Sequence, residues 1–268
     1  MKHKAFTLTE LLVTLVVILS ITALLLPALH NARNAAKAAA CSANLARLLT
    51  AMAAYESMNE SLPPGLETGR EPPPVGGYPG NKGYDSMGWW WFNYIDVYSG
   101  DWPYKPSAVK CPAKHLTSQA FQNDILCGNY GANLSICREA GQTNTEFKGL
   151  ALSRSEVHNQ SRTMLLADSG YAIIKWHHAT QNPPVALNKN KIRDTAAYIP
   201  GLSINSQRLA QKLISTGMEK DALDGRHPGK TVNIGFVDGH VERVQAEGLL
   251  TDRDGNPVAG SDIMWKTK

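Results

Sequence analysis

Residues 6–29 read FTLTELLVTLVVILSITALLLPAL, and this stretch decides the fold. Glu10 is its one charged residue, so the run from Leu11 to Leu29 carries no charge. About 20 apolar residues suffice for one helix to cross the hydrocarbon core of a bilayer. The apolar part of a secretory signal is shorter, which favours a lasting membrane helix. Ionised groups within a membrane are costly and usually have a function, so Glu10 is the residue to explain.

The helical pattern continues well beyond the apolar run. Apolar side chains recur at intervals of four and three residues at Cys41, Leu45, Leu48, Met52 and Tyr55. This spacing marks one face of a helix, and the many alanines between these positions favour helix intrinsically. We predict one helix from Phe6 to about Asn59, roughly 80 Å long. Pro27 should bend it or open a turn, because proline donates no backbone hydrogen bond and crowds the preceding turn.

The remaining residues alternate short strand and loop patterns. Residues 62–82 are dense in Pro and Gly, which stops the helix. Strands are predicted over 163–168 and 171–176, joined by a turn at 168–170, and an amphipathic helix over 203–218. The clearest hairpin spans 231–244, where Asp238-Gly239 favours a type I′ turn. The tail from Glu247 is predicted to be loop. Within it, residues 263–265 are the segment expected to dock on the domain.

Three consecutive tryptophans, Trp89-Trp90-Trp91, open a segment that reads as a short helix through Ile95. Aromatic faces can stack on sugars, so the segment allows a glycan-binding interpretation. The alternative is core packing, which aromatic side chains dominate by area. We favour core packing.

Charge and cysteine content narrow the partners and the compartment. The net charge of +4, from 27 basic and 23 acidic residues, does not indicate nucleic-acid binding, which needs a clustered basic patch. Four cysteines make disulfides feasible in an exported domain. Cys111, Cys127 and Cys137 lie close together in sequence and are the candidates, whereas Cys41 lies apart on the helix. Sequence alone chooses no pairing, and free buried thiols remain the alternative.

The N-terminus resembles the type IV prepilins and the pseudopilins of type II secretion systems. The resemblance rests on Ala5-Phe6 at the polar-to-apolar boundary, on Glu10 four residues after Phe6, and on Pro27 late in the apolar run. It implies that a prepilin peptidase cleaves between Ala5 and Phe6 and methylates the new amine of Phe6. It also implies that Glu10 makes an assembly contact. Ala5 stands where the family usually has Gly, so we expect slower or normal cleavage.

A second resemblance lies near the C-terminus. Arg226-His227, ten further residues and then Asp238-Gly239-His240 are similar to the His-(nine residues)-Asp-Gly signature of a pilin-like family. The chain has one spacer residue more than that signature. Further matches, spread over most of the chain, are Cys41 with Asn44-Leu45, Lys110-Cys111-Pro112, Asn129-Tyr130-Gly131 and Leu165–Ser169. The resemblance assigns His227, Asp238 and Gly239 to the signature but supplies no chemistry for it.

Two interpretations of the signature are open. In the structural one, Asp238 and Gly239 form a turn while His227 hydrogen-bonds a backbone group or a carboxylate. In the other, a transition metal binds imidazole and carboxylate groups. Its ligands would be His227, Asp238 and His240, with Asp168 or the pair His177-His178.

Calcium is a further, weak possibility near the tail. Asp252, Asp254 and Asn256 give the oxygen-rich alternation that calcium prefers. The stretch lacks the Glu that closes an EF-hand loop. We therefore assign no metal and no cofactor, and rank calcium near the tail above zinc at the histidines.

The resemblances together imply an α+β, pilin-like fold. In it a long N-terminal helix packs on a small antiparallel sheet with large loop insertions. The expected divisions are a leader at 1–5, a transmembrane and filament-core helix at 6–29, its amphipathic continuation at 30–59, and an extracytoplasmic globular domain at 60–268. Lys2 and Lys4 should stay cytoplasmic, which places the single-pass chain in the inner membrane with its C-terminal domain outside.

The expected function is a structural subunit of a type IV pilus-like or type II secretion filament. Its expected partners are other pilins or pseudopilins, a prepilin peptidase and the inner-membrane assembly platform. The alternative is a membrane-tethered extracellular binding protein, with glycans as one candidate ligand. No G-x-S-x-G, H-E-x-x-H or P-loop pattern is present, so we do not expect an enzyme.

Overall fold

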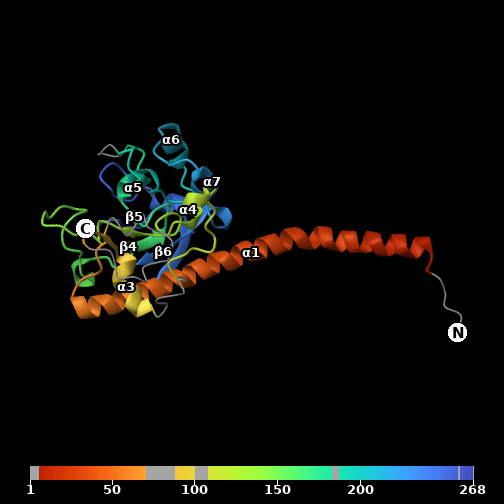
Figure 1. Cartoon of the computed structure of the whole chain (residues 1–268), viewed down its shortest axis with the longest axis horizontal. Coiled ribbons are helices and arrows are strands. Elements are labelled where there is room, and N and C mark those ends of the chain that lie inside the picture. The colour runs from red at the N-terminus through yellow and green to blue at the C-terminus, as the bar shows by residue number, and fades with distance from the viewer. Residues whose placement is uncertain (1–5, 71–87, 100–107, 183–186, 259, 268) are drawn as a thin grey trace.

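The structure is a computed structural model that describes residues 6–70, 88–99, 108–182, 187–258 and 260–267. Ala5 and the rest of the predicted leader, with the second part of the Pro- and Gly-rich segment, lie outside these described residues. Figure 1 shows the arrangement: one long helix, α1, extends from a globular domain that sits against its C-terminal half.

Helix α1 spans Leu8–Asn59 without interruption, close to the predicted bounds. It begins in a capping box: the Thr7 hydroxyl accepts from the Glu10 N–H, and the Glu10 carboxylate accepts from the Thr7 N–H at 2.9 Å. It ends at Glu60, which adopts the left-handed conformation (φ 62°) typical of a helix C-terminus. The helix continues through Pro27, and no turn opens there.

The C-terminal half of α1 is buried on one face, as its periodicity predicts. The buried positions are Ala38, Cys41, Leu45, Leu48, Leu49, Ala51 and Met52, and Tyr55 packs against them. Gly235 allows the close approach of this face to the sheet, because a Cβ atom there would lie 2.6 Å from a methyl carbon of Leu49. A glycine on the strand therefore sets how deeply the helix sits.

A five-stranded mixed sheet lies under the helix. Its strands are β3 (Tyr130–Asn133), β4 (Met164–Asp168), β5 (Ile173–Ile174), β6 (Thr231–Phe236) and β7 (Val241–Gln245). The order is β5-β3-β4-β6-β7, antiparallel except for the parallel pair β3–β5. A two-stranded antiparallel sheet joins β1 (Leu66–Thr68) to β2 (Gly88–Trp90). The fold is thus α+β, with a long N-terminal helix on a small sheet.

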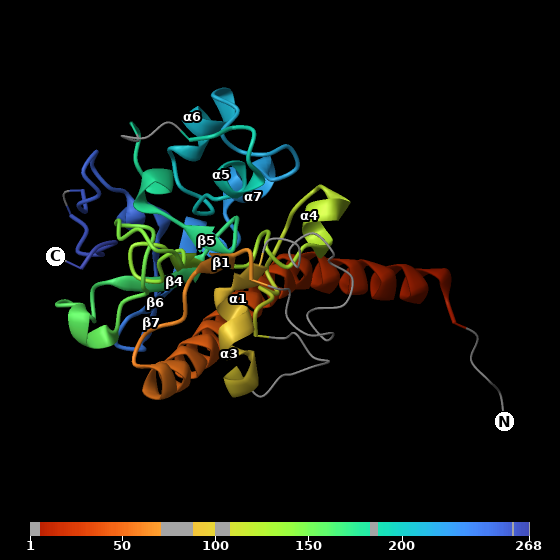
Figure 2. The same cartoon turned by 60° about the vertical axis from the view of Figure 1, so that its left-hand side comes forward.

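Short helices surround the sheet, and some of them lie on the side away from α1 (Figures 1 and 2). The remaining helices are α3 (Trp91–Ser99), α4 (Gln119–Asn123), α5 (Ile192–Thr195), α6 (Asn205–Ala210) and α7 (Glu219–Asp224), with 3₁₀ turns η1 (Arg154–Glu156), η2 (Trp176–Ala179), η3 (Pro228–Lys230) and η4 (Ala246–Leu249). Figures 1 and 2 place the strands between α1 and the group α5–α7. This sandwiching explains why every residue of β3 and β4 is buried.

Two sequence predictions are corrected. Strands β4 and β5 both form, but they do not pair as a hairpin, because β3 lies between them. The segment after β4 instead follows β3, with the Ser169 N–H donating to the Asn129 carbonyl at 3.0 Å. The helix predicted over 203–218 is limited to α6, because Lys212 takes a left-handed conformation (φ 56°) that ends it.

The predicted hairpin of β6 and β7 forms with a different turn. Its loop holds three residues: the Phe236 N–H donates to the His240 carbonyl at 2.9 Å, and the Gly239 N–H donates to the Phe236 carbonyl at 3.0 Å. Gly239 alone in this loop has a positive φ (99°), whereas a type I′ turn needs two such residues. Val237 adds the third loop residue, which suits a type I turn followed by a left-handed glycine.

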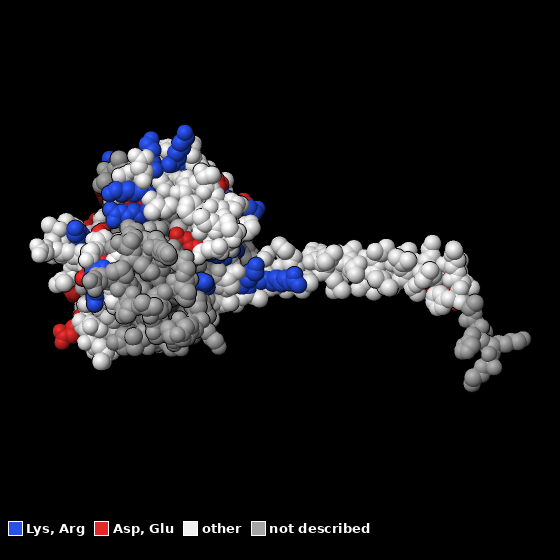
Figure 3. Space-filling model, in the orientation of Figure 1, with Lys and Arg blue, Asp and Glu red and all other residues white. Residues whose placement is uncertain are grey.

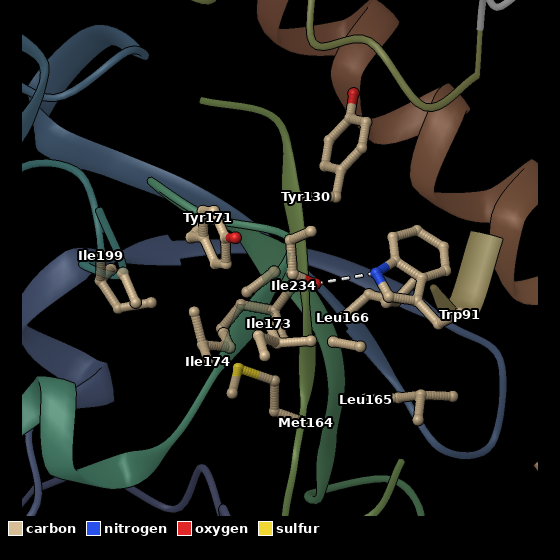
Figure 4. Close-up of a cluster of buried hydrophobic side chains, with 14 of the residues drawn as sticks. Trp91, Tyr130, Met164, Leu165, Leu166, Tyr171, Ile173, Ile174, Ile199 and Ile234 are labelled. Carbon is tan, nitrogen blue, oxygen red and sulfur yellow. Dashed lines mark hydrogen bonds between the residues drawn. The ribbon is translucent and has the colours of Figure 1, made fainter. Parts of the chain in front are cut away.

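The aromatic segment and the tail both enter the core. Trp90 ends β2 and Trp91 begins α3, so the helix starts two residues later than predicted, and both side chains are fully buried. The Trp91 indole N–H donates to the Ala172 carbonyl at 2.8 Å (Figure 4). In the tail, Ile263 and Trp265 are buried, and the Met264 carbonyl accepts from the Met164 N–H at 2.9 Å. The tail docks as predicted.

Candidate functional site

The N-terminal half of α1 is an exposed apolar rod. Its large apolar side chains, from Phe6 to Leu29, are each 49–80% exposed. Figure 3 shows this half projecting without Lys or Arg until a basic group close to the domain. Along the chain, the first basic residues after the apolar run are Arg33 and Lys37, both exposed. Within the described part of the chain, α1 is the one helix long and apolar enough to span a membrane.

Glu10 is the one charge on this rod. Its Oε2 atom accepts from the Thr7 N–H at 2.9 Å and from the Thr7 hydroxyl at 2.7 Å. Phe6, 70% exposed, precedes the helix, while Ala5 lies outside the described residues. The carboxylate is therefore held by its own helix end, with its remaining acceptor capacity open to a partner.

A second region brings together residues far apart in sequence. Cys41 of α1, Cys111 of the segment before α4, Asp168 at the end of β4 and His227 before β6 are all buried. One ligand atom from each lies within 4.8 Å of the other three. The two cysteine sulfurs are 2.6 Å apart. We call these four residues the junction cluster, because they lie where α1 meets the domain.

An imidazole–carboxylate pair forms one side of the cluster. His227 Nε2 is 3.0 Å from Asp168 Oδ2, which also accepts from the Asn233 N–H at 2.6 Å. Burial opposes the charge on His227, but hydrogen bonds to Asp168 and Cys111 and their negative charges outweigh it and raise its pKa to about 9. Asp168 Oδ1 and His227 Nδ1 have no hydrogen-bond partner of good geometry. With this pKa, His227 is protonated at neutral pH, and the pair retains unused polar atoms.

Arg226, next to His227, fastens the same region. Its fully buried guanidinium contacts both carboxylate oxygens of Asp221 at 2.8–3.0 Å. It also donates to the Asn129 carbonyl at 2.8 Å and the Ser169 carbonyl at 2.7 Å. The Tyr198 hydroxyl donates to Asp221 at 2.7 Å, so the buried carboxylate is well satisfied. The Arg-His pair thus ties α7 to the ends of β3 and β4.

The other residues that carried the second resemblance surround the cluster. Asn44 Nδ2 donates to the Lys110 carbonyl at 3.1 Å, and the Tyr130 hydroxyl donates to the Cys41 carbonyl at 3.3 Å. Asn129 Oδ1 accepts from the Cys111 N–H at 3.0 Å. A cavity of about 380 Å³ opens beside Cys111, lined by Lys110, Pro112, Lys114, Gln122, Asn123, Asp124 and Asn129. Five separate sequence matches therefore meet at one place.

The signature itself does not form a joint metal site. His227 precedes β6 and Asp238 follows it, and six strand residues separate such ends by about 20 Å. His240 stacks on Phe236 and hydrogen-bonds Asp238 at 2.6 Å, away from His227. The interpretation with His227, Asp238 and His240 on one metal is therefore wrong. Asp238 and Gly239 lie in the turn and His227 meets a carboxylate, as in the structural interpretation.

The other metal candidates are likewise separate. His177 and His178 lie in η2, where burial lowers the pKa of His177 to about 4 and keeps His178 neutral. In the tail, Asp252 Oδ1 accepts from the N–H groups of Asp254 and Asn256 at 2.8 and 2.9 Å. Its carboxylate therefore organises the loop. Over the described residues, the junction cluster is the set of three or more ligand side chains that converge.

The cysteine arrangement differs from the sequence expectation. All four cysteines are buried free thiols, as in the alternative kept from the sequence, and Cys111 contacts Cys41 rather than Cys127 or Cys137. The position of Cys41 on the buried helix face was the available signal. Arg226 and Asn233 were also missed, and only the adjacency of Arg226 to His227 pointed to either.

Few tryptophans remain for a glycan site. Trp90, Trp91, Trp176 and Trp265 are buried. Trp89 is half-buried, with the Arg70 guanidinium 4.0 Å above its ring. Trp102 lies outside the described residues. The aromatic segment serves mainly as core.

Comparisons with known proteins give no relative on which to draw. No protein-family model matches the chain, and neither curated proteins nor solved structures include a match to it.

Proposed function

We propose that the protein is a structural subunit of a pilus-like or type II secretion-like filament, anchored before assembly by the N-terminal half of α1. The observation that carries the proposal is the apolar rod of residues 6–29, each large side chain of which is exposed while the rest of the same helix is buried. So large an exposed apolar surface needs a covering, and an all-round apolar helix fits lipid or a bundle of identical helices.

The boundaries of the rod suit both environments. Arg33 and Lys37 lie just beyond the apolar surface, where basic side chains can reach lipid head groups. Towards the N-terminus, cleavage before Phe6 would give a positively charged amine four residues from Glu10. These two ends define an apolar segment of membrane thickness.

Glu10 gives the assembly its register. In a filament, the carboxylate would lie beside the Phe6 amine of a neighbouring subunit, so that each buried charge has a partner. Removing one partner of a buried pair costs about 3–5 kcal/mol, which is enough to block one helical register. Within a single subunit, the Thr7 groups satisfy only part of the carboxylate.

The test uses Glu10→Val and Glu10→Gln in a host that has a prepilin peptidase and a matching assembly system. Both variants should be processed to a Phe6 N-terminus, seen by mass as loss of residues 1–5, and both should be depleted from sheared filaments. The matched control is Thr14→Val, an uncharged change on the same exposed rod, which should be incorporated normally. Normal incorporation of Glu10→Val, or an N-terminus that remains Met1, would refute the proposal.

A further inference from the structure

We propose that Cys41 and Cys111 form a disulfide in the exported protein, which fastens the inner half of α1 to the globular domain. The proposal rests on the proposed function only in requiring that this domain reach an oxidising compartment. The bond would link two elements separated by 70 positions in sequence.

The positions of the two sulfurs carry the proposal. The two free thiols lie 2.6 Å apart, well below the roughly 3.5–4.0 Å at which unbonded heavy atoms rest and about 0.5 Å beyond an S–S bond of about 2.05 Å. Both side chains are buried, at 0% and 4% exposure. Two thiols that face each other so closely are placed to form a bond with little movement of either side chain.

The backbone around both cysteines is fixed independently of the sulfurs. The Cys41 carbonyl accepts from the Tyr130 hydroxyl, and the Cys111 N–H donates to Asn129. Asn44, one helical turn beyond Cys41, donates to the carbonyl of Lys110. These contacts hold the segments around Cys41 and Cys111 in the relative position that the bond requires.

A zinc ion is the main alternative occupant, since His227 Nδ1 and Asp168 Oδ1 are buried without partners. Tetrahedral zinc with Zn–S bonds of about 2.3 Å holds two thiolates about 3.8 Å apart. The cysteines would have to separate by about 1 Å for both to bind it. The present spacing favours the disulfide, and zinc becomes an outcome of the test.

The oxidation needs a two-electron acceptor, and a disulfide donor such as oxidised glutathione supplies it by exchange. Cys111 reacts first, because it lines the 380 Å³ cavity whereas Cys41 is fully enclosed; burial raises the pKa of the Cys111 thiol, so this step is slow at neutral pH. Its thiolate attacks one glutathione sulfur, and the first glutathione leaves with the proton that Cys111 gave up. Cys41 then loses its proton and attacks the Cys111 sulfur, releasing the second glutathione. Two protein thiols are oxidised and one glutathione disulfide is reduced to two thiols.

The sequence makes the bond easy to map. Trypsin would release Cys41 in residues 38–47 and Cys111 in residues 111–114, while Cys127 and Cys137 share residues 115–138. The full chain is purified from membranes in detergent, incubated with oxidised glutathione, alkylated without reduction, and digested. We expect one mass that joins 38–47 to 111–114, with both cysteines of 115–138 alkylated.

Three outcomes would overturn the proposal. They are alkylated Cys41 and Cys111 after oxidation, a bond from either of them to 115–138, or stoichiometric zinc that protects both thiols in the purified protein. The N-terminal peptide from the same digest reports on the proposed function separately. Trypsin also cuts after Lys2 and Lys4, so an uncleaved chain gives a first long peptide of residues 5–33, whereas a processed chain gives residues 6–33. The 5–33 peptide would refute the filament subunit, whereas the oxidised linkage would still be read from purified protein.

Cysteine variants give a second test of the disulfide that does not depend on peptide mapping. In wild type, a reductant should lower the thermal midpoint of the domain by about 10 °C. Cys41→Ala should abolish that shift, while Cys127→Ala, a change at a buried free thiol, should retain it. An equal shift in wild type and Cys41→Ala would contradict the disulfide.

Discussion

The two halves of α1 both carry large apolar side chains, but these side chains have opposite surroundings. In the outer half, every large apolar side chain is at least 49% exposed, whereas Cys41, Leu45 and Leu48 of the inner half are fully buried. The inner half restricts its apolar residues to one stripe, and β6 meets that stripe with Gly235. The outer half is apolar all round, so a single domain cannot cover it. The difference shows that one continuous helix presents two kinds of surface, one buried against the domain and one uncovered.

The largest expected effect is on membrane association. The full chain should sediment with membranes and resist carbonate extraction, because residues 6–29 are apolar and uncovered. A chain that starts at residue 30 should be recovered almost entirely in the soluble fraction. Sedimentation followed by immunoblotting measures both. Recovery of the full chain without detergent would show that the two halves do not differ as described.

Leucine truncations in the two halves should differ in their effect on domain stability. Leu48→Ala removes a fully buried side chain and should lower the free energy of unfolding by about 2–5 kcal/mol. Leu15→Ala, at 52% exposure, should change it by less than about 0.5 kcal/mol. Urea titration of the detergent-solubilised chain, followed by the fluorescence of the buried tryptophans, gives both values. Similar losses would contradict the division of α1.

The stability of the domain where it meets α1 should depend on pH through His227. Its pKa in the folded chain, about 9, lies above the ordinary value of 6.5, so its stabilisation is complete below pH 6.5 and lost as pH rises through 9. The loss should be about 3 kcal/mol. Asp168, the Cys111 thiol and the nearby Arg226 are the charged or titratable groups around the ring in the reduced chain, so the measurement is made with a reductant present.

Urea midpoints measured across this range test the effect of His227. His227→Gln should remove most of the decline between pH 6.5 and 9. His30→Gln, at an exposed position on α1 outside the domain, is the matched control and should keep the wild-type profile. A profile that His227→Gln leaves unchanged would place the titration elsewhere.

The smallest effect is expected at the first turn of α1. Thr7→Val removes the hydroxyl that accepts from the Glu10 N–H, which should cost about 1 kcal/mol of local helix stability. Hydrogen exchange at residues 8–11 should quicken, while exchange in the buried half stays constant. Thr14→Val is the control, since the Thr14 hydroxyl donates to the Leu11 carbonyl and caps nothing. Faster exchange in both halves would argue against their independence.

Features with a local signal could be predicted from sequence. The bounds of α1 follow from apolar composition and alanine content, and the β6–β7 hairpin follows from Asp238-Gly239 between two β-branched runs. The turn type was wrong because Val237 belongs to the loop, and the choice between two and three loop residues depends on strand register.

Features set by distant partners could not be predicted. β5 pairs with β3 although β4 precedes it in sequence, because the chain after β4 passes β3 and adds β5 at the edge of the sheet. Cys111 meets Cys41, 70 positions away, only after α1 docks. The helix predicted over 203–218 stops early. Ile214, which the periodicity places on the buried face of that helix, is buried instead from the turn that follows α6. Local periodicity predicts which face of a helix or strand is buried. The junction cluster depends on which of these faces come into contact, and periodicity does not predict that.

Pro27 has a mechanical consequence. It lacks the N–H that would reach the carbonyl of Ala23, so the helix is most compliant there, about three turns before the first buried position, Ala38. Tension or torque applied at the N-terminus would be absorbed as flexure at this point. The part of α1 that packs on the sheet would move together with the domain as one rigid body, and its core contacts would stay intact.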